Sequence, residues 1–248
     1  MRIIARLDIK GSNVVKTVRN EGLRVVGEPV ALARKYYEDG IDELVYMDIV
    51  ASLYGRNLDF DLLKAVSRDI FVPLTVGGGI RSLHDIESAL RAGADKVAIN
   101  TYAIQHPEFL TQAAERFGAQ CIVLAIDAKK TDAGTYEAYT DGGREKTGVD
   151  VLEWVERATT LGIGEIVLSS VDRDGTRSGY DIDLVREVSQ VASTPVVAHA
   201  GAGSLADIAD VCRAGASAVS LSSLLHYGDV SVTDIKTYLT QEGITVRL

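Results

Sequence analysis

The stretch PLTVGGGIRSLHDIESALRAGADKVAIN, residues 73–100, returns later in the chain as PVVAHAGAGSLADIADVCRAGASAVSLS, residues 195–222. The two stretches align without a gap, from residue 73 to residue 195, at an offset of 122. The same offset relates GIDELVYMDI at residues 40–49 to GIGEIVLSSV at residues 162–171. Two segments that share one spacing indicate a duplicated four-strand half.

Short β-branched runs alternate with stretches of helical apolar spacing along the chain, which is typical of parallel strands joined by helices. The expected strands cover residues 3–8, 43–48, 72–76, 96–99, 122–126, 165–170, 195–198 and 218–221. The expected helices cover residues 29–38, 59–68, 83–92, 107–117, 149–161, 182–191, 205–214 and 232–240.

Eight parallel strands in two similar halves predict an α/β fold of the (β/α)8 TIM barrel type. An open doubly wound sheet is less favoured, because it would show one glycine-rich turn near its start and no such symmetry. At 248 residues the chain has the usual length of one barrel, so we expect a single domain over residues 1–248.

The composition limits the classes of partner. A formal charge of −9 and no run of basic residues argue against binding to nucleic acid or to an acidic membrane surface. Cys121 and Cys212 lie in apolar stretches, where inert buried thiols are more usual than a disulfide or a metal site. Charged residues interrupt the N-terminal segment and no run approaches membrane-spanning length, so we expect a soluble cytoplasmic protein.

Each half of the chain carries a glycine stretch between a strand and a helix. The first is Gly77-Gly78-Gly79, before a helix that starts near Ser82, and the second is residues 200–203, before a helix near Ser204. Glycine lets an anion approach backbone N–H groups closely, and a helix start adds further donors. A lone glycine run is as often a tight turn, but two symmetric copies favour anion binding.

These features predict a long ligand with a phosphate at each end, the two phosphates being held half a barrel apart. A loop with Asp174, Gly175 and Thr176 supplies further donors beside the second site. The candidate phosphate ligands are Gly79, Asn100 and Thr101 at the first site, and Asp174, Gly175, Thr176, Gly201, Gly203, Ser222 and Ser223 at the second.

Two carboxylates are the candidate catalytic groups. Asp8 ends the first predicted strand and Asp127 follows the fifth, and these strands face each other across an eight-membered ring. Each residue alone has a plain alternative as a helix cap. Together they are placed to flank the middle of a ligand, one accepting a proton and the other donating one.

Other polar residues near strand ends have lesser expected roles. Asp48 and Asp172 are interpreted as supporting groups, and His199 and His226 as possible ligand contacts near the mouth. His84 and His106 are expected on the surface. No metal-binding signature is present, so neither a metal nor a cofactor is predicted.

The chain resembles the cyclase subunit of imidazole glycerol phosphate synthase over nearly its whole length. The matching stretches are RIIARLDIK, VVK ending at Lys16, GIDELVYMDI, TVGGGI, AGADKVAINT, AIDAKK, YTDGGREKTG, SSVDRDGTRSGYD and VSVTDIKTYLTQEGITVRL. The resemblance implies Asp8 as general base, Asp127 as general acid and Lys16 as the lysine of the mobile loop. The implied reaction joins ammonia to a ribulosyl-linked imidazole-carboxamide with two phosphates.

The same resemblance implies a separate glutaminase subunit, which delivers ammonia through the barrel from the N-terminal ends of the strands. Its entrance in the family is a ring of four charges, and any one such charge is also unremarkable as a rim salt bridge. The residues at the matching positions are Arg2, Glu43, Lys96 and Glu165.

Three positions depart from the family pattern. Arg6 must face inward if Asp8 does, where the family usually has a cysteine, and we expect it to pair with Asp8 and narrow the ammonia route. The stretch NEGLRVVGEP lacks the family's acidic residue, and Ala200 replaces a glycine of the second phosphate site.

Two alternatives remain open. One is a paralogue, similar in ARLDIKG and ASLYGRN to relatives that deliver nitrogen to a nucleotide-linked sugar in surface-glycan synthesis. The other is a non-catalytic barrel that only docks and activates a glutaminase.

Overall fold

The computed structural model describes residues 1–19 and 21–247. Asn20, the first residue of the NEGLRVVGEP stretch, and Leu248, the last residue of the closing stretch, lie outside the described residues.

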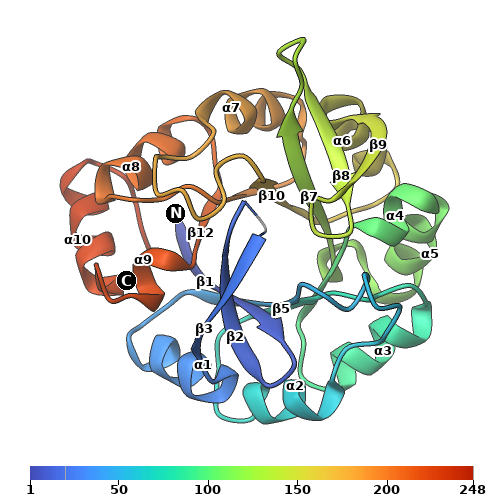
Figure 1. The fold of residues 1–248 in the computed structure, drawn as a ribbon, viewed down its shortest axis with the longest axis horizontal. Helices are drawn as coiled ribbons and strands as arrows, with labels where there is room; N and C mark the ends of the chain where they lie inside the picture. The colour runs from blue at the N-terminus through green and yellow to red at the C-terminus, as the bar shows by residue number, and fades with distance from the viewer. Residues whose placement is uncertain (20, 248) are drawn as a thin grey trace.

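Eight parallel strands form a closed barrel, as the sequence predicts (Figure 1). Pairing of β7 with β10 and of β12 with β1 closes the ring, and the first and fifth barrel strands, β1 and β7, lie on opposite sides. The barrel strands are β1 (Arg2–Lys10), β4 (Glu43–Asp48), β5 (Leu74–Gly77), β6 (Lys96–Ile99), β7 (Ile122–Lys130), β10 (Glu165–Ser170), β11 (Val196–His199) and β12 (Ala218–Leu221).

The eight predicted helices all form, and Figure 1 shows them as an outer ring around the strands. Most begin at a residue whose side chain accepts a backbone N–H of the first turn, as Asp59, Ser82 and Asp181 do. The helices are α1 (Pro29–Glu38), α2 (Phe60–Ser67), α3 (Leu83–Arg91), α5 (Glu108–Phe117), α6 (Val151–Thr160), α7 (Ile182–Val191), α8 (Leu205–Arg213) and α10 (Val232–Gln241).

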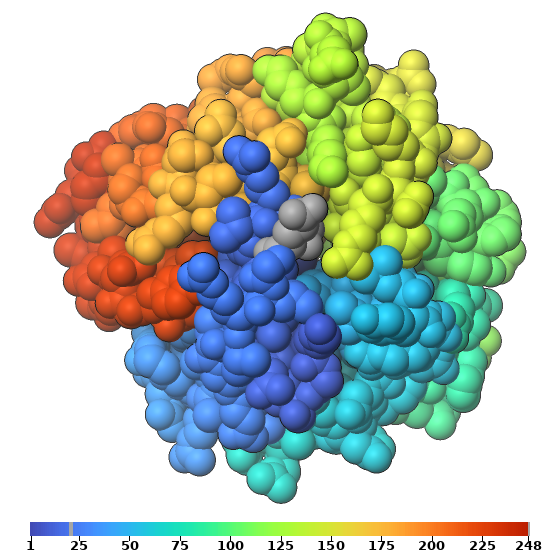
Figure 2. Space-filling view, viewed as in Figure 1, coloured from blue at the N-terminus to red at the C-terminus, as the bar shows by residue number. Residues whose placement is uncertain are grey.

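Two hairpins that the sequence analysis did not predict stand on the carboxyl ends of the barrel strands. Strand β1 continues beyond the barrel into β2 (Asn13–Val18) and β3 (Glu21–Gly27), and β7 continues into β8 (Tyr136–Thr140) and β9 (Glu145–Asp150). Asp8 and Asp127 lie where parallel pairing inside the barrel gives way to antiparallel pairing in the hairpins. In Figure 2 the β2–β3 hairpin crosses the centre of this face.

Three short helices were also not predicted: α4 (Thr101–Gln105), α9 (Ser223–His226) and the 3-10 turn η1 (Ala119–Cys121). Helices α4 and α9 directly follow β6 and β12, which are equivalent strands of the two halves. They therefore bring Asn100 and Ser222, their N-cap residues, to equivalent places at the mouth.

The apolar core has two parts. The larger part lies between the strands and the helices, and the smaller part fills the barrel interior. The interior residues are Ile4, Val45, Ala98, Val123, Val167, Val197 and Ala218. Among the described residues, no helix combines the length and the hydropathy that a membrane crossing requires.

Candidate functional site

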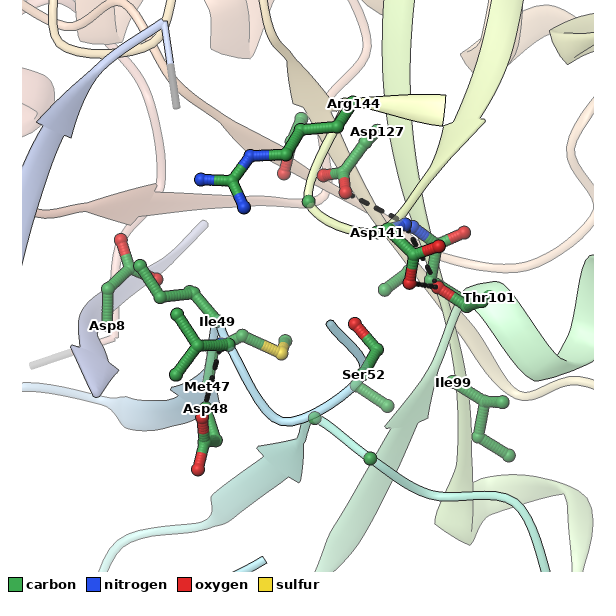
Figure 3. Close-up of a pocket in the computed structure, with 18 of the residues that line it drawn as sticks. Asp8, Met47, Asp48, Ile49, Ser52, Ile99, Thr101, Asp127, Asp141 and Arg144 are labelled. Carbon is green, nitrogen blue, oxygen red and sulfur yellow. Dashed lines mark hydrogen bonds between the residues drawn. The ribbon is translucent and has the colours of Figure 1, made fainter. Parts of the chain in front are cut away.

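A cavity of about 320 Å³ opens at the carboxyl ends of the barrel strands. Asp8 and Asp127 both line it, and Figure 3 shows them on opposite sides with the cavity between them. The closed ring explains this arrangement, because β1 and β7 are four strands apart in either direction. Both carboxylates are thus able to contact one bound molecule.

Asp8 lies almost fully buried at 4% exposure, and its Oδ1 accepts a hydrogen bond of 2.7 Å from Arg6 Nε. Burial alone raises the pKa of this carboxyl, but the charges of Arg6 and Lys16 outweigh it and hold the pKa below its usual range. Asp8 is therefore ionised at neutral pH and is able to accept a proton. The predicted inward-facing Arg6–Asp8 pair is confirmed.

Asp127 has the opposite electrostatic setting. Burial raises the pKa of Asp127 to about 6, and the negative charges of Asp8 and Asp174 add to this against the charge of Arg6. Its Oδ2 accepts a hydrogen bond of 3.1 Å from Asn100 Nδ2. A carboxyl with a pKa near neutrality is suited to donating a proton. The pKa values of the two acids therefore differ in the direction that general base catalysis by Asp8 and general acid catalysis by Asp127 require.

The first predicted phosphate site borders this cavity. Gly79, Asn100 and Thr101 all line it, and Asn100 binds Asp127. The Thr101 hydroxyl accepts the Asp141 backbone N–H at 3.1 Å and donates to Asp141 Oδ1 at 3.5 Å, a long bond that an anion in the cavity would replace. A side chain at Gly79 would collide with the carbonyl oxygen of Arg56, so close packing of the backbone also requires this glycine.

The second predicted phosphate site is a separate, smaller hollow of about 20 Å³. It is lined by Gly175, Gly201, Ser222, Ser223 and Lys16 among others.

Lys16 lies in β2 with its side chain turned inward, and its Nζ is 2.6 Å from Asp174 Oδ1. Asp174 Oδ2 accepts the Thr17 hydroxyl at 2.7 Å. Asp174 therefore ties the β2–β3 hairpin to the loop after β10, and the hairpin closes the second site.

Thr176 and Gly203, which the sequence placed at the second phosphate site, line neither of these two cavities. The Thr176 hydroxyl donates to Arg173 O at 2.8 Å, and the Gly203 N–H donates to Asp207 Oδ2 at 2.9 Å.

At the starts of α3 and α8, which the sequence analysis proposed for anion binding, backbone N–H groups are already bonded to side chains of the same segment. Ser82 and Asp85 satisfy the first turn of α3, and Ser204 and Asp207 satisfy that of α8. The cavities meet the chain instead at the starts of α4 and α9.

Ala200 occupies a backbone conformation that normally selects glycine, with φ of 79°. Its equivalent in the first half is Gly78, with φ of 106°. Ala200 lines both the main cavity and the second site, so its methyl group lies where the two meet.

Of the two expected supporting carboxylates, only Asp48 lines the main cavity. It binds Arg56 Nη2 at 2.9 Å, and burial raises its pKa even though the Val50 N–H and Arg56 oppose this. Asp172 is exposed and accepts the Lys130 N–H at 2.9 Å.

Of the two histidines expected near the mouth, His199 lines the main cavity and the second site, whereas His226 lines neither. His199 is buried in the cavity wall, where burial and the charge of Arg6 lower its pKa to about 3, so the ring is neutral. His226 Nδ1 lies 2.7 Å from the Tyr36 hydroxyl, and burial lowers the pKa of His226 to about 4. His84 and His106 are exposed.

Sequence reasoning missed Arg144, which lies in the loop between β8 and β9. Its guanidinium extends into the cavity near Asp127 (Figure 3), and no partner for it is found in the described part of the chain. The β8–β9 hairpin positions it, and that hairpin was not predicted. The only signal in the sequence was a basic residue beside Gly142-Gly143.

At the other end of the barrel, four charged side chains form a closed ring of alternating sign. Arg2 binds Glu43 at 2.6 Å and Glu165 at 2.5 Å, and Lys96 binds the same two carboxylates at 3.2 Å and 2.8 Å. The structure therefore brings together all four residues that the sequence analysis grouped. The apolar barrel interior lies between this ring and the cavity.

Comparison with known proteins decides the family. The model of the histidine biosynthesis protein family matches residues 2–231, which is more than half of the chain. The chain belongs to this family.

Two curated relatives are similar over the full length. Imidazole glycerol phosphate synthase subunit HisF of Streptomyces coelicolor is 47% identical over 247 residues, which cover 100% of this chain and 98% of the relative. The subunit HisF of Streptomyces griseus subsp. griseus is 45% identical with the same coverage. The resemblance to the cyclase subunit that the sequence motifs suggested is thereby confirmed.

Proposed function

We propose that the protein is the cyclase subunit of an imidazole glycerol phosphate synthase in histidine biosynthesis. It would use ammonia to convert a ribulosyl aminoimidazole-carboxamide with two phosphates into imidazole glycerol phosphate and the carboxamide ribotide. Full-length similarity to HisF proteins supports the activity. The observation that carries it is the shared cavity, with Asp8, whose pKa is lowered, on one side and Asp127, whose pKa is raised to about 6, on the other.

The two carboxyls would divide the proton transfers. Asp8 accepts the proton that the attacking nitrogen must lose, and Asp127 donates a proton to the atom that leaves the substrate carbon. The predicted sites at Gly79, Asn100 and Thr101 and at Gly175, Gly201 and Ser222 would hold the two phosphates. Holding both ends orients the middle of the substrate between the carboxylates.

The partner of this subunit would be a glutaminase that docks at the N-terminal ends of the barrel strands. The ring of Arg2, Glu43, Lys96 and Glu165 supports this, since it is the ordered polar entrance to the apolar interior. Both cysteines are free thiols, which fits a location in the reducing cytoplasm.

A direct assay tests the proposal. The purified chain, given ammonium and the bis-phosphate substrate, should form imidazole glycerol phosphate, and Asp8→Asn and Asp127→Asn should each reduce the rate by about 10²-fold or more. Failure of the wild-type protein to turn over, with folding intact, contradicts the proposal. If both variants keep the activity of the glutaminase complex unchanged, the chain acts only as a docking barrel.

One observation favours a second candidate function. Arg6 occupies the barrel interior where the family usually carries a small cysteine, so the ammonia acceptor would differ from the imidazole precursor. This is the paralogue that delivers nitrogen to a nucleotide-linked sugar. Product formation in the assay above rules it out as the main activity.

A further inference from the structure

Arg6 lies at a boundary inside the barrel. The side chains of β1 that face inward are Arg2, Ile4, Arg6 and Asp8 in order, because alternate residues of a strand share one face. Arg2 belongs to the charged ring, Ile4 to the apolar interior, and Asp8 to the cavity. Arg6 is therefore the first charged group that the cavity meets on its inner side.

The Arg6 guanidinium is held at two points. Its Nε donates to Asp8 Oδ1 at 2.7 Å, and its Nη1 donates to Ser169 Oγ on β10 at 3.3 Å. The side chain is 11% exposed, so it has little freedom to move without breaking these bonds. Because the guanidinium is planar, contacts on two different strands set the orientation of the whole group.

Asp8 depends on Arg6 for its own orientation. Among the described residues, Arg6 is the only side chain found to donate a hydrogen bond to the Asp8 carboxylate. Lys16, the other nearby cation, is bound to Asp174 instead. A buried carboxylate with one strong donor takes its direction from that donor.

We propose that Arg6 is a positioning residue of the active site, which orients the Asp8 carboxylate toward the cavity and keeps it charged. This inference rests on the proposed function, because the roles of acceptor and donor refer to that reaction. Ser169 is the second part of the same arrangement, since it binds the guanidinium from β10, three strands away from β1 around the barrel.

A purely structural Arg6–Asp8 pair would make a different prediction from a positioning pair. A structural pair affects stability alone, whereas a positioning pair also sets the pH range over which Asp8 accepts a proton. The pH dependence of the rate therefore separates the two.

The first test measures kcat/KM from about pH 3 to about pH 8, a range that includes the acid limb set by Asp8, for the wild type, Arg6→Gln, Arg6→Lys and Ser169→Ala. Loss of the positive charge in Arg6→Gln should move the acid limb upward by at least about one pH unit, a tenfold change in the proton equilibrium. Arg6→Lys should keep the limb in place but reduce kcat by about tenfold or more, because lysine lacks the planar fork. Ser169→Ala should lower kcat without moving the limb.

Arg56→Gln is the matched control, because Arg56 also binds a carboxylate of the cavity, Asp48, at 2.9 Å. Its acid limb should coincide with that of the wild type. A profile of Arg6→Gln that coincides with the wild type, in a protein shown to be folded by circular dichroism, overturns the inference.

A second test needs no turnover. Titration of the Asp8 carboxyl carbon by NMR, without substrate, should show a higher pKa in Arg6→Gln than in the wild type, by about one unit or more. An unchanged Asp8 titration overturns the inference about Arg6, whatever the wild-type enzyme makes. A wild type that forms no product, combined with a shifted Asp8 titration, removes the proposed function and leaves Arg6 as the group that positions Asp8. If Arg6→Gln does not fold, the same titration in Arg6→Lys and Ser169→Ala decides: a line width and shift of the Asp8 carboxyl equal to wild type in both overturns the inference.

Discussion

Asn100 Nδ2 donates a hydrogen bond of 3.1 Å to Asp127 Oδ2, and the same nitrogen lies 3.2 Å from the carbonyl oxygen of Tyr139. The amide thus connects the start of α4, the end of the barrel strand β7 and the β8–β9 hairpin. It also stabilises the charged form of Asp127, yet burial dominates and raises the pKa of Asp127 to about 6.

This setting predicts that Asp127→Asn stabilises the protein above neutrality. The folded state binds the Asp127 proton more tightly than the unfolded chain does, so the contribution of this group is favourable at low pH and is lost as pH rises through about 6. The free energy of unfolding of Asp127→Asn should match that of the wild type near pH 4 and exceed it by roughly 1–3 kcal/mol near pH 8. Urea unfolding at both pH values measures this. A difference that does not grow with pH contradicts the expectation.

The charged ring predicts that removing a lysine of the ring lowers the free energy of unfolding more than removing a lysine on the surface. Lys96→Met leaves the buried carboxylates of Glu43 and Glu165 with Arg2 alone, so we expect a loss of about 1–3 kcal/mol in the free energy of unfolding. Lys64→Met is the control, because Lys64 pairs with Asp61 on the surface, and it should change stability by less than about 0.5 kcal/mol. Equal effects in the two variants show that the ring is not a buried network.

A substitution at Gly175 tests how closely the β2–β3 hairpin packs against the loop after β10. A methyl group at Gly175 would lie 2.3 Å from Thr17 O, whereas one at Gly134 meets nothing within 4 Å, although both glycines have positive φ. Gly175→Ala should therefore destabilise the protein by at least about 2 kcal/mol and Gly134→Ala by only about 1 kcal/mol, the cost of the backbone conformation. Thermal unfolding compares them, and similar melting temperatures argue against close seating of the hairpin.

Arg144 predicts a change in substrate binding rather than in chemistry. Its guanidinium, for which the described residues offer no partner, faces the cavity, so Arg144→Gln should raise KM by about tenfold through loss of a charge-assisted contact, with kcat changed by less than about threefold. Arg91→Gln, at an exposed pair with Glu87, should leave both constants unchanged. An unchanged KM in Arg144→Gln removes this residue from the binding site.

The barrel was predictable because its signals are repeated. Every parallel strand and every long helix of the structure matches an expected one within a few residues, since β-branched runs and helical spacing mark both halves. The placement of Asp8 and Asp127 followed from their positions at strand ends and from barrel closure, whereas the four ring residues were grouped by the family resemblance.

The hairpins were not predictable in the same way. The stretch Asn13–Val18 contains Lys16 and Thr17, whose side chains are buried by their bonds to Asp174 rather than by apolar packing. Strand Glu145–Asp150 has no buried residue to mark it. The position of Arg144 and the closure of the second site depend on these hairpins, so both were missed, although the second site itself was predicted. The roles of Thr176 and Gly203 stay predictions, and the sequence did not reveal their partners within the protein, Arg173 O and Asp207 Oδ2.

The duplicated half also means that the molecule contains its own comparison for many substitutions. Arg81 and Gly203, at equivalent positions, each donate a backbone N–H to an equivalent aspartate, Asp85 or Asp207. Asp85→Ala and Asp207→Ala would remove the same contact from two different surroundings within one polypeptide. A difference between the stability effects of two such equivalent substitutions measures how far the surrounding residues change the strength of the same local hydrogen bond, without comparison with a second protein.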